Sequence, residues 1–277
     1  MRPEDLLMQV GYIDYLNCYP FYYHMFEKQP LKSIRIIPGL PSELNRMMKD
    51  KMLDLSPVSS ATYADIKDDV LLLPEFCLSS AGYVGSVILC SKFPIEALNN
   101  KKVGLSVASH TSRVLLKILL EKFYRIEPYY LQAGPRPDLT AHDAALIIGN
   151  DAMRGCTDMA PYKYDLGELW LQKTGFPVVF AVFAVRKNVI RENLQELRTV
   201  INSYRLSLEC LVQEKESVVI KARQKYPDIS YDVNGYYDTL QFEFTDNLKN
   251  ALKYYLSAAE ELNLLKKVES LNFLEIE

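Results

Sequence analysis

Small hydroxyl and amide side chains follow three apolar stretches of the sequence, and these are the residues best suited to binding or chemistry. Asn17 follows GYIDYL, Ser56 and Ser59 lie in LDLSPVSS, and Ser109 and Ser112 end VGLSVASHTS. In open α/β sheets the carboxyl ends of the strands face the ligand crevice. A helix that begins there offers free N–H groups and a partial positive charge, worth about 0.3–1 kcal/mol to an anion. Three such positions around one cleft would hold a small carboxylate without many lysines.

Each of these residues also has a purely structural explanation. Ser, Thr and Asn are preferred helix N-caps, so Ser59, Ser109 and Thr111 could serve only as caps. Asn17 could be an ordinary turn residue before a helix that starts with proline. Ser86, inside the apolar stretch VGSVILCS, is harder to explain in this way, because a buried hydroxyl needs a hydrogen-bond partner.

The sequence lacks the motifs of common cofactor and metal sites. It contains no GxxxxGK[ST], GxGxxG or GxSxG, so phosphate-loop, dinucleotide and serine-hydrolase functions lack support. The three histidines (His24, His110 and His142) form no HExxH or HxH group, and the five cysteines form no CxxC pair. We therefore expect no metal site. The scattered cysteines also suggest that the protein works in a reducing compartment. His110 lies in the loop of Ser109 and could either contact a ligand or be solvated.

The length, composition and charge of the chain exclude several other classes of protein. The 277 residues, 49% hydrophobic and 24% charged, allow one large globular domain or two smaller ones. Thirty-two basic against 35 acidic side chains leave a net charge of −3, so no overall field attracts nucleic acid. No apolar run approaches the roughly 20 residues that cross a bilayer. The opening MRPEDLLMQV is unlike a secretory signal. We expect a cytoplasmic protein with no nucleic-acid or membrane partner.

Short apolar runs alternate with longer amphipathic ones, which predicts an α/β fold. The expected strands are 7–13, 33–37, 53–57, 70–73, 84–91, 102–106, 144–148 and 178–185. The expected helices are 20–27, 41–49, 60–66, 111–123 and 166–174, followed by a mainly helical C-terminal part with helices over 192–215, 217–225 and 246–265.

Two unbroken apolar runs, 84–91 and 177–185, suggest how the chain is divided. If both are crossover strands between lobes, residues 92–176 form an inserted lobe. Residues 1–91 and 177–277 then form the other lobe, which carries the C-terminal helices. This is the plan of a two-lobe binding protein, with the ligand cleft at the crossover.

Six segments occur in a specific order and spacing: GYIDYLNCYP, DLSPVSSATYA, SSAGYVGSVILCSK, the helix that starts at SHTS, ALIIGNDAM and YDLGELWLQKTGFPVVFAVFAVR. Together they resemble the chorismate dehydratases of the futalosine route to menaquinone, over roughly residues 8–186. The resemblance implies the two-lobe fold of type 2 periplasmic solute-binding proteins. It also implies removal of water from the dicarboxylate chorismate to give 3-[(1-carboxyvinyl)oxy]benzoate, with no metal or organic cofactor, by a monomer or homodimer.

The resemblance implies catalytic roles for Asn17 and Ser86. The residues expected to bind the substrate are Tyr15, Ser56, Ser59, Gly85, Ser109, Thr111, Ser112 and Asn150, with the three at the SHTS helix start as carboxylate binders. Because these segments supply amides and hydroxyls but no obvious base, we hypothesise substrate assistance. The enolpyruvyl carboxylate would take the C3 proton, while Asn17 holds the substrate and the departing hydroxyl.

Two other functions fit the same fold. One is a solute-binding protein that captures a small carboxylate, although the absence of a signal peptide counts against export. The other is the sister enzyme 1,4-dihydroxy-6-naphthoate synthase, which relies on a cleft histidine that neither His110 nor His142 matches. A regulatory effector-binding domain is less well supported, since no DNA-binding helix pair precedes the lobes.

Overall fold

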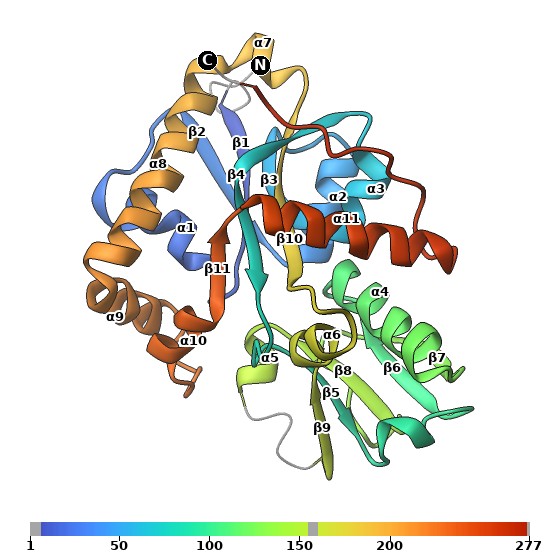
Figure 1. Cartoon of the computed structure of the whole chain (residues 1–277). Coiled ribbons are helices and arrows are strands. Elements are labelled where there is room, and N and C mark those ends of the chain that lie inside the picture. The colour runs from blue at the N-terminus through green and yellow to red at the C-terminus, as the bar shows by residue number, and fades with distance from the viewer. Residues whose placement is uncertain (1–6, 155–159, 276–277) are drawn as a thin grey trace.

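The computed structural model describes residues 7–154 and 160–275, and its strands form two separate sheets (Figure 1). The six-stranded sheet has the order β11-β4-β10-β3-β1-β2, and the five-stranded sheet has the order β7-β6-β8-β5-β9. We call the parts of the chain built around them the first lobe and the second lobe. The α/β prediction is therefore confirmed, as a two-lobe architecture.

The first sheet mixes parallel and antiparallel strands. Its members are β1 (Met8–Ile13), β2 (Ile34–Gly39), β3 (Leu55–Ser59), β4 (Val70–Ser80), β10 (Val178–Arg186) and β11 (Leu240–Glu243). Strand β1 runs parallel to β2 and β3, whereas β10 runs antiparallel to β3 and β4. The second sheet consists of β5 (Val87–Ser91), β6 (Lys102–Ser106), β7 (Tyr129–Ala133), β8 (Ala144–Ile148) and β9 (Tyr162–Asp165).

Helices cover both faces of the first sheet. Figure 1 shows α1 (Tyr19–Tyr23), α8 (Leu194–Gln213) and α9 (Lys215–Lys225) on one side, and α2 (Pro41–Lys49), α3 (Ser60–Ile66) and α11 (Asp246–Glu261) on the other. The second lobe carries α4 (His110–Ile118), α5 (Asn150–Met153) and α6 (Leu166–Thr174). The remaining helices are α7 (Val189–Glu192), α10 (Val233–Thr239) and the short 3₁₀ turn Ile95–Ala97. Helices α1 and α4 continue into π-helical turns, His24–Lys28 and Leu119–Tyr124.

Most predicted elements are found, several with the predicted bounds: 41–49, 60–66, 166–174, 102–106 and 144–148. The sequence did not predict the strands β7, β9 and β11 or the short helices α5, α7 and α10. Strands β7 and β9 are largely exposed, so they lack the apolar alternation of a half-buried strand. Strand β4 continues well beyond the predicted end, because a register shift against β10 accommodates the Pro-Glu pair in its middle.

The chain passes between the sheets twice, in residues 81–86 and in residues 175–177. Each apolar run predicted as a crossover strand therefore begins at a crossing and then pairs within one sheet. Strand β10 stays in the first sheet, as expected. Strand β5 belongs to the second sheet, so residues 87–91 lie in the second lobe and not in the first, where the prediction placed them.

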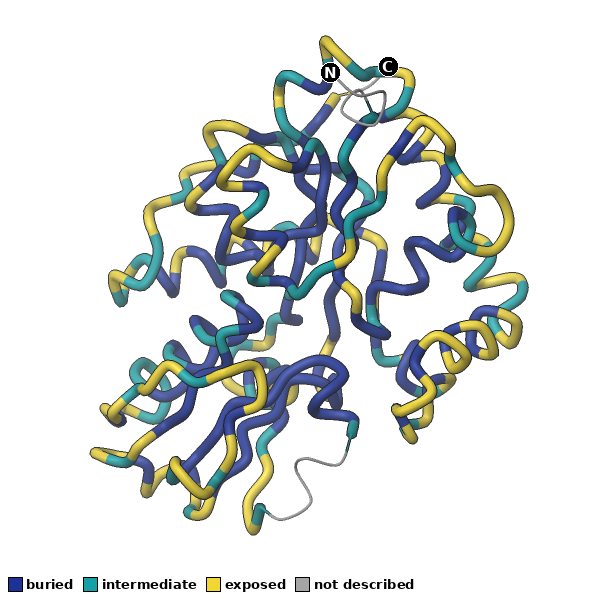
Figure 2. The backbone as a smooth tube through the Cα atoms, turned by 180° about the vertical axis from the view of Figure 1, so that it is seen from behind, coloured by how far each residue is buried: buried dark blue, intermediate teal, exposed yellow. Residues whose placement is uncertain are grey.

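Aromatic side chains fill the first lobe between the sheet and the α1–α8 layer. Phe21 packs on Phe183 with ring centroids 4.5 Å apart, and Tyr204 lies edge-on to both Phe21 and Phe183. Two of these buried tyrosines pair their hydroxyls: Tyr204 donates to the Tyr22 hydroxyl at 2.9 Å, and Tyr22 donates to a backbone carbonyl. Figure 2 shows buried backbone running through the middle of both lobes. Most of the unusual tyrosine content thus serves the core.

Of the five cysteines, Cys156 lies outside the described residues, as do the first six residues of the N-terminal segment. Among the other four, Cys18, Cys77 and Cys210 are free thiols. Burial raises the pKa of all three, that of Cys77 to about 12. These three therefore lack the lowered pKa of a reactive thiolate, which agrees with a structural role.

Candidate functional site

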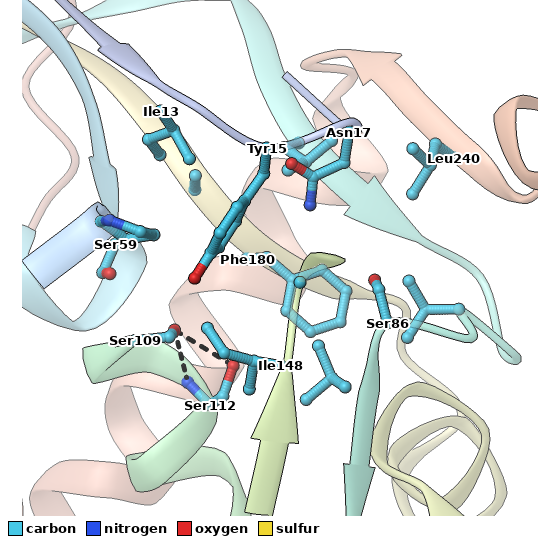
Figure 3. A pocket seen from close by; sticks show the side chains of 16 residues that line it. Ile13, Tyr15, Asn17, Ser59, Ser86, Ser109, Ser112, Ile148, Phe180 and Leu240 are labelled. Atoms are coloured by element: carbon cyan, nitrogen blue, oxygen red, sulfur yellow. Dashed lines mark hydrogen bonds between the residues drawn. The ribbon is translucent and has the colours of Figure 1, made fainter. Parts of the chain in front are cut away.

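A cavity lies between the two lobes, where the end of β1 faces β5, β8 and the start of α4 (Figure 3). It contains about 500 Å³ of space between its lining atoms, part of it open to solvent. The lining residues are Ile13, Tyr15, Asn17, Pro41, Ser59, Leu78, Val84, Ser86, Val87, Ser109, Ser112, Ile148, Gly149, Phe180, Ala181 and Leu240. This set contains no Asp, Glu, His, Lys or Arg. The cavity is therefore an apolar space with hydroxyl and amide groups, a common composition for small-molecule sites.

Two serine hydroxyls of the cavity already accept a hydrogen bond from within the protein. Ser59 Oγ accepts from Asn45 Nδ2 at 2.9 Å, and Ser109 Oγ accepts from both the hydroxyl and the N–H of Ser112, at 3.1 and 3.3 Å. A serine hydroxyl has only one hydrogen. No described residue accepts the hydroxyl hydrogen of Ser59 or of Ser109. Both hydroxyls can therefore donate this hydrogen to a ligand.

Ser86 behaves in the same way on the opposite wall. Its Oγ accepts from the Tyr236 hydroxyl at 2.9 Å, and its carbonyl accepts from Gly149 N–H at 2.7 Å. Asn17 Oδ1 is buried and has no hydrogen-bond partner among the described residues. The cavity thus offers three serine donors and one amide acceptor, which suits a ligand with carboxylates and a hydroxyl.

Tyr15 crosses the cavity toward the start of α4 (Figure 3). Its ring lies against Gly149, where a Cβ atom would come within 2.5 Å of it. The Tyr15 hydroxyl is buried and has no hydrogen-bond partner among the described residues. Burial, with a smaller contribution from Asp151, raises the pKa of Tyr15 above its ordinary value. The hydroxyl is therefore protonated and available to a ligand.

Two of the predicted substrate binders are turned away from the cavity. Ser56 Oγ is buried in the first sheet, where it donates to the Pro57 carbonyl at 2.9 Å. Thr111 Oγ1 donates to the Phe180 carbonyl at 2.9 Å and accepts from Ala61 N–H at 3.3 Å. Thr111 therefore joins α4 to the first lobe.

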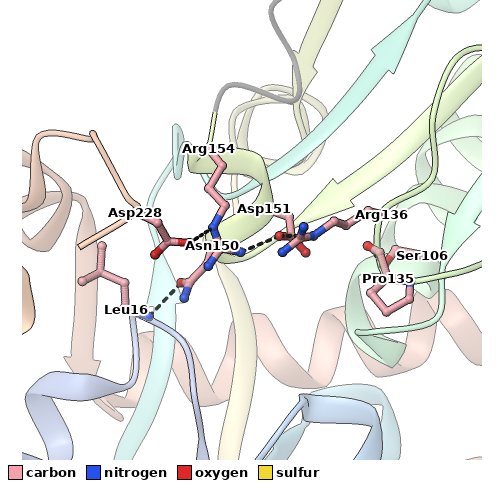
Figure 4. Close-up of polar contacts among 8 residues, drawn as sticks. All are labelled: Leu16, Ser106, Pro135, Arg136, Asn150, Asp151, Arg154 and Asp228. Atoms are coloured by element: carbon pink, nitrogen blue, oxygen red, sulfur yellow. Dashed lines mark hydrogen bonds and ion pairs between the residues drawn. The ribbon is translucent and has the colours of Figure 1, made fainter. Parts of the chain in front are cut away.

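The other two, Gly85 and Asn150, support the walls and are not in the lining set. Gly85 has a positive φ of 70°, and its N–H donates to Asp165 at 2.7 Å. Asn150 Oδ1 accepts from Leu16 N–H at 2.9 Å (Figure 4). Because Leu16 belongs to the first lobe and Asn150 to the second, this bond holds the Asn17 segment against α5.

Ion pairs at the edge of the cavity also connect the lobes (Figure 4). Arg154, the residue that follows α5, pairs with Asp228 of the C-terminal part at 2.6 Å and with Asp151 at 2.6 Å. Arg136 approaches the same Asp151 carboxylate at 2.7 Å. Because Arg154 joins Asp151 of the second lobe to Asp228 of the first, we assign this cluster to lobe alignment and not to chemistry.

His110 does not line the cavity. Its Nδ1 lies 3.2 Å from Thr62 Oγ1, between α3 and α4. Burial, with a smaller contribution from the Arg113 charge, lowers the pKa of His110 to about 4. The imidazole is therefore neutral near pH 7.

This pKa predicts a pH dependence of stability. The unfolded chain takes up the His110 proton near pH 6.5, whereas the folded protein takes it up only near pH 4. The stabilisation is complete above about pH 6.5 and is lost as the pH falls toward 4. In urea unfolding at several pH values, His110→Gln should lose less stability over this interval than the unchanged protein. A His142→Gln variant serves as control, and equal slopes for the unchanged protein and His110→Gln would contradict the prediction.

Comparison with known proteins identifies the family. A family model described as menaquinone biosynthesis matches residues 8–261. The chain belongs to the menaquinone-biosynthesis family. This family member is 32% identical to a chorismate dehydratase from Thermus thermophilus, over 68% of this chain and 71% of the relative. It is 25% identical to the chorismate dehydratase of Campylobacter jejuni, over 93% and 100% of the two chains. It is also 24% identical to a 1,4-dihydroxy-6-naphtoate synthase of Thermus thermophilus, over 69% and 68%.

Solved structures confirm the fold of this menaquinone-biosynthesis protein. Protein AF1704 from Archaeoglobus fulgidus has a TM-score of 0.76 at 16% identity, over 96% of this chain and 100% of that one. The alkanesulfonate-binding protein SsuA from Xanthomonas axonopodis has a TM-score of 0.68 at 13% identity, over 95% of both chains. The type 2 periplasmic-binding-protein-like prediction is thereby confirmed.

The described residues are 7–154 and 160–275. Among these residues, no three His, Cys, Asp or Glu side chains gather where they could hold a metal ion. None of the helices in these residues is both long enough and apolar enough to span a bilayer.

Sequence reasoning missed Tyr236, the residue whose hydroxyl donates to Ser86. It lies on α10, which was not predicted and which belongs to the first lobe, 150 positions after Ser86. The only signal in the sequence is the pair Tyr236-Tyr237, which by itself indicates no more than a buried aromatic face.

Proposed function

We propose that this protein is a chorismate dehydratase, which converts chorismate to 3-[(1-carboxyvinyl)oxy]benzoate and water. The observation that carries the proposal is that Asn17 and Ser86 point into the same cavity (Figure 3). They come from two of the segments that resemble the chorismate dehydratases. The identity with the Thermus and Campylobacter enzymes of that name supports the same activity.

The chemistry requires loss of the C3 hydrogen and of the C4 hydroxyl. In the proposed mechanism the enolpyruvyl carboxylate takes the C3 proton. The C–H electron pair moves into the ring as a dienolate, whose charge rests on the ring carboxylate. The C4–O bond then breaks, the hydroxide leaves and combines with the proton to give water, and the ring becomes aromatic.

Lack of a base in the cavity wall favours this substrate-assisted mechanism. No lining residue is an Asp, Glu, His or Lys, and burial keeps the Tyr15 hydroxyl protonated. The protein would contribute orientation and hydrogen bonds: Ser59 and Ser109 are placed to donate to a carboxylate as the dienolate charge develops. We propose that no metal or organic cofactor takes part, and that the enzyme acts in the cytoplasm as a monomer or homodimer.

The test is to incubate the purified, metal-stripped protein with chorismate and to analyse the products by liquid chromatography and mass spectrometry. A product lighter than chorismate by one water molecule, with the aromatic ultraviolet spectrum of an enolpyruvyl-oxybenzoate, is expected. Unchanged chorismate together with a saturable binding isotherm would favour a solute-binding protein. If the protein neither converted nor bound chorismate, the proposal would be contradicted. Naphthoate synthase activity would then be the next function to assay.

A further inference from the structure

Tyr236 is a buried residue of α10, with 2% of its surface exposed, and its hydroxyl donates to Ser86 Oγ. Its ring is held by edge-to-face packing on Tyr231, with ring centroids 5.9 Å apart, and by contact with the Tyr237 ring. The hydroxyl therefore has a fixed position behind Ser86, one of the two residues that we assign to catalysis.

The direction of the bond between Tyr236 and Ser86 decides what each group can do. The Tyr236 hydroxyl has a single hydrogen, and it donates this hydrogen to Ser86 Oγ at 2.9 Å. It therefore has no hydrogen left for Asn17. Asn17 Oδ1 is buried without a hydrogen-bond partner among the described residues, so it is available to accept a hydrogen from a ligand.

We propose that Tyr236 is a positioning residue that makes Ser86 the hydrogen-bond donor, and Asn17 Oδ1 the acceptor, for the C4 hydroxyl of chorismate. This inference rests on the proposed function and names the groups that act on the leaving group. The C4 hydroxyl would donate its hydrogen to Asn17 Oδ1, while its oxygen accepts from Ser86. As the C4–O bond breaks, negative charge grows on that oxygen and the bond from Ser86 strengthens.

The chain of bonds also strengthens the donor. A hydroxyl that accepts a hydrogen bond becomes a better donor, by about 10–30% per bond in a low-dielectric site. Tyr236 donates to Ser86, and Ser86 is left to donate into the cavity. Burial raises the pKa of Tyr236 above its ordinary value, so Tyr236 keeps its proton and acts by polarising Ser86, not by transferring a proton.

Replacing Tyr236 with phenylalanine tests the proposal, because Tyr236→Phe removes one oxygen and leaves the ring. We expect kcat to fall about 10- to 100-fold, the effect of losing a hydrogen bond to a developing charge, with KM changed less than about threefold. Tyr204→Phe is the matched control. It removes an equally buried hydroxyl from the core of the first lobe and is expected to lower thermal stability without lowering kcat.

A double-mutant cycle separates positioning from a general structural effect. In a Ser86→Ala background, Tyr236→Phe should lower kcat by less than about threefold further, because its target is gone. A kcat of Tyr236→Phe within about twofold of the unchanged protein, or a full additive loss in the Ser86→Ala background, would overturn the inference.

Two further outcomes are informative. If Tyr236→Phe does not fold, the test relies on Ser86→Ala alone. Full turnover by Ser86→Ala would contradict a series of hydrogen bonds in which Ser86 donates to the substrate. If the unchanged protein does not dehydrate chorismate, the proposed function fails, and the inference fails with it. Activity of the unchanged protein with no effect of either substitution rejects only the inference.

Discussion

Replacing Asn17 with alanine is expected to lower kcat for chorismate dehydration by about 10²–10³-fold, the usual cost of removing one preorganised polar group from a transition-state site. The loss should appear mainly in kcat and not in KM. Asn17 Oδ1 is buried without a hydrogen-bond partner among the described residues, so it is available to the leaving hydroxyl. The ligand carboxylates are left to other groups, among them Ser59 and Ser109, so binding should change by less than about tenfold.

Steady-state kinetics on Asn17→Ala, with isothermal titration of a product analogue, measures both quantities. Asn99→Ala is a suitable control, since Asn99 is an exposed amide that only accepts a backbone hydrogen bond from Glu127. Unchanged turnover in Asn17→Ala would rule out a catalytic role for this residue. An equal loss in kcat and affinity would indicate that Asn17 binds substrate without favouring the transition state.

Gly149→Ala is expected to produce the second large effect. The new Cβ would lie 2.5 Å from the Tyr15 ring, and the backbone here has φ 61° and ψ −141°, which strongly favours glycine. We expect a loss of about 1–3 kcal/mol in the free energy of unfolding. Since Tyr15 must move out of the cavity, kcat/KM should fall by about 100-fold, as expected when a positioned group shifts by about 1 Å.

Gly134→Ala is the control for this substitution, because a Cβ at Gly134 would meet nothing within 4 Å. Urea unfolding and kinetics on both variants separate a local effect on Tyr15 from a general effect of losing a glycine. If Gly149→Ala bound and converted chorismate like the unchanged protein, Tyr15 would not be part of the site.

The sequence predicted the buried strands and most helices because their apolar periodicity follows directly from burial. It also identified Asn17, Ser59, Ser86 and Ser109, which the structure brings to one cavity. Without the strand geometry, the sequence could not show that Ser56, unlike these residues, faces away from the cavity. Ser56 and Ser59 are three positions apart on β3, and side chains alternate between faces along a strand, so only one of the two can face the cavity.

The same geometric reason applies on α4. Ser109 and Ser112 are three residues apart and lie on one side of a helix, whereas Thr111 points about 100° away from Ser112. That direction leads to the Phe180 carbonyl of β10, which the sequence could not place. Tyr236 could not be predicted at all, since its partners are far away in the chain and short helices such as α10 have little periodicity.

The pH profile of chorismate turnover tests most directly whether the substrate supplies its own base. The cavity lining contains no carboxylate, imidazole or amine, and carboxylates titrate near pH 4. We therefore predict that kcat and kcat/KM are constant from about pH 6 to about pH 9. A limb with an apparent pKa of about 6–8 in either profile would show that a titrating group of the protein takes the proton, and would contradict the mechanism.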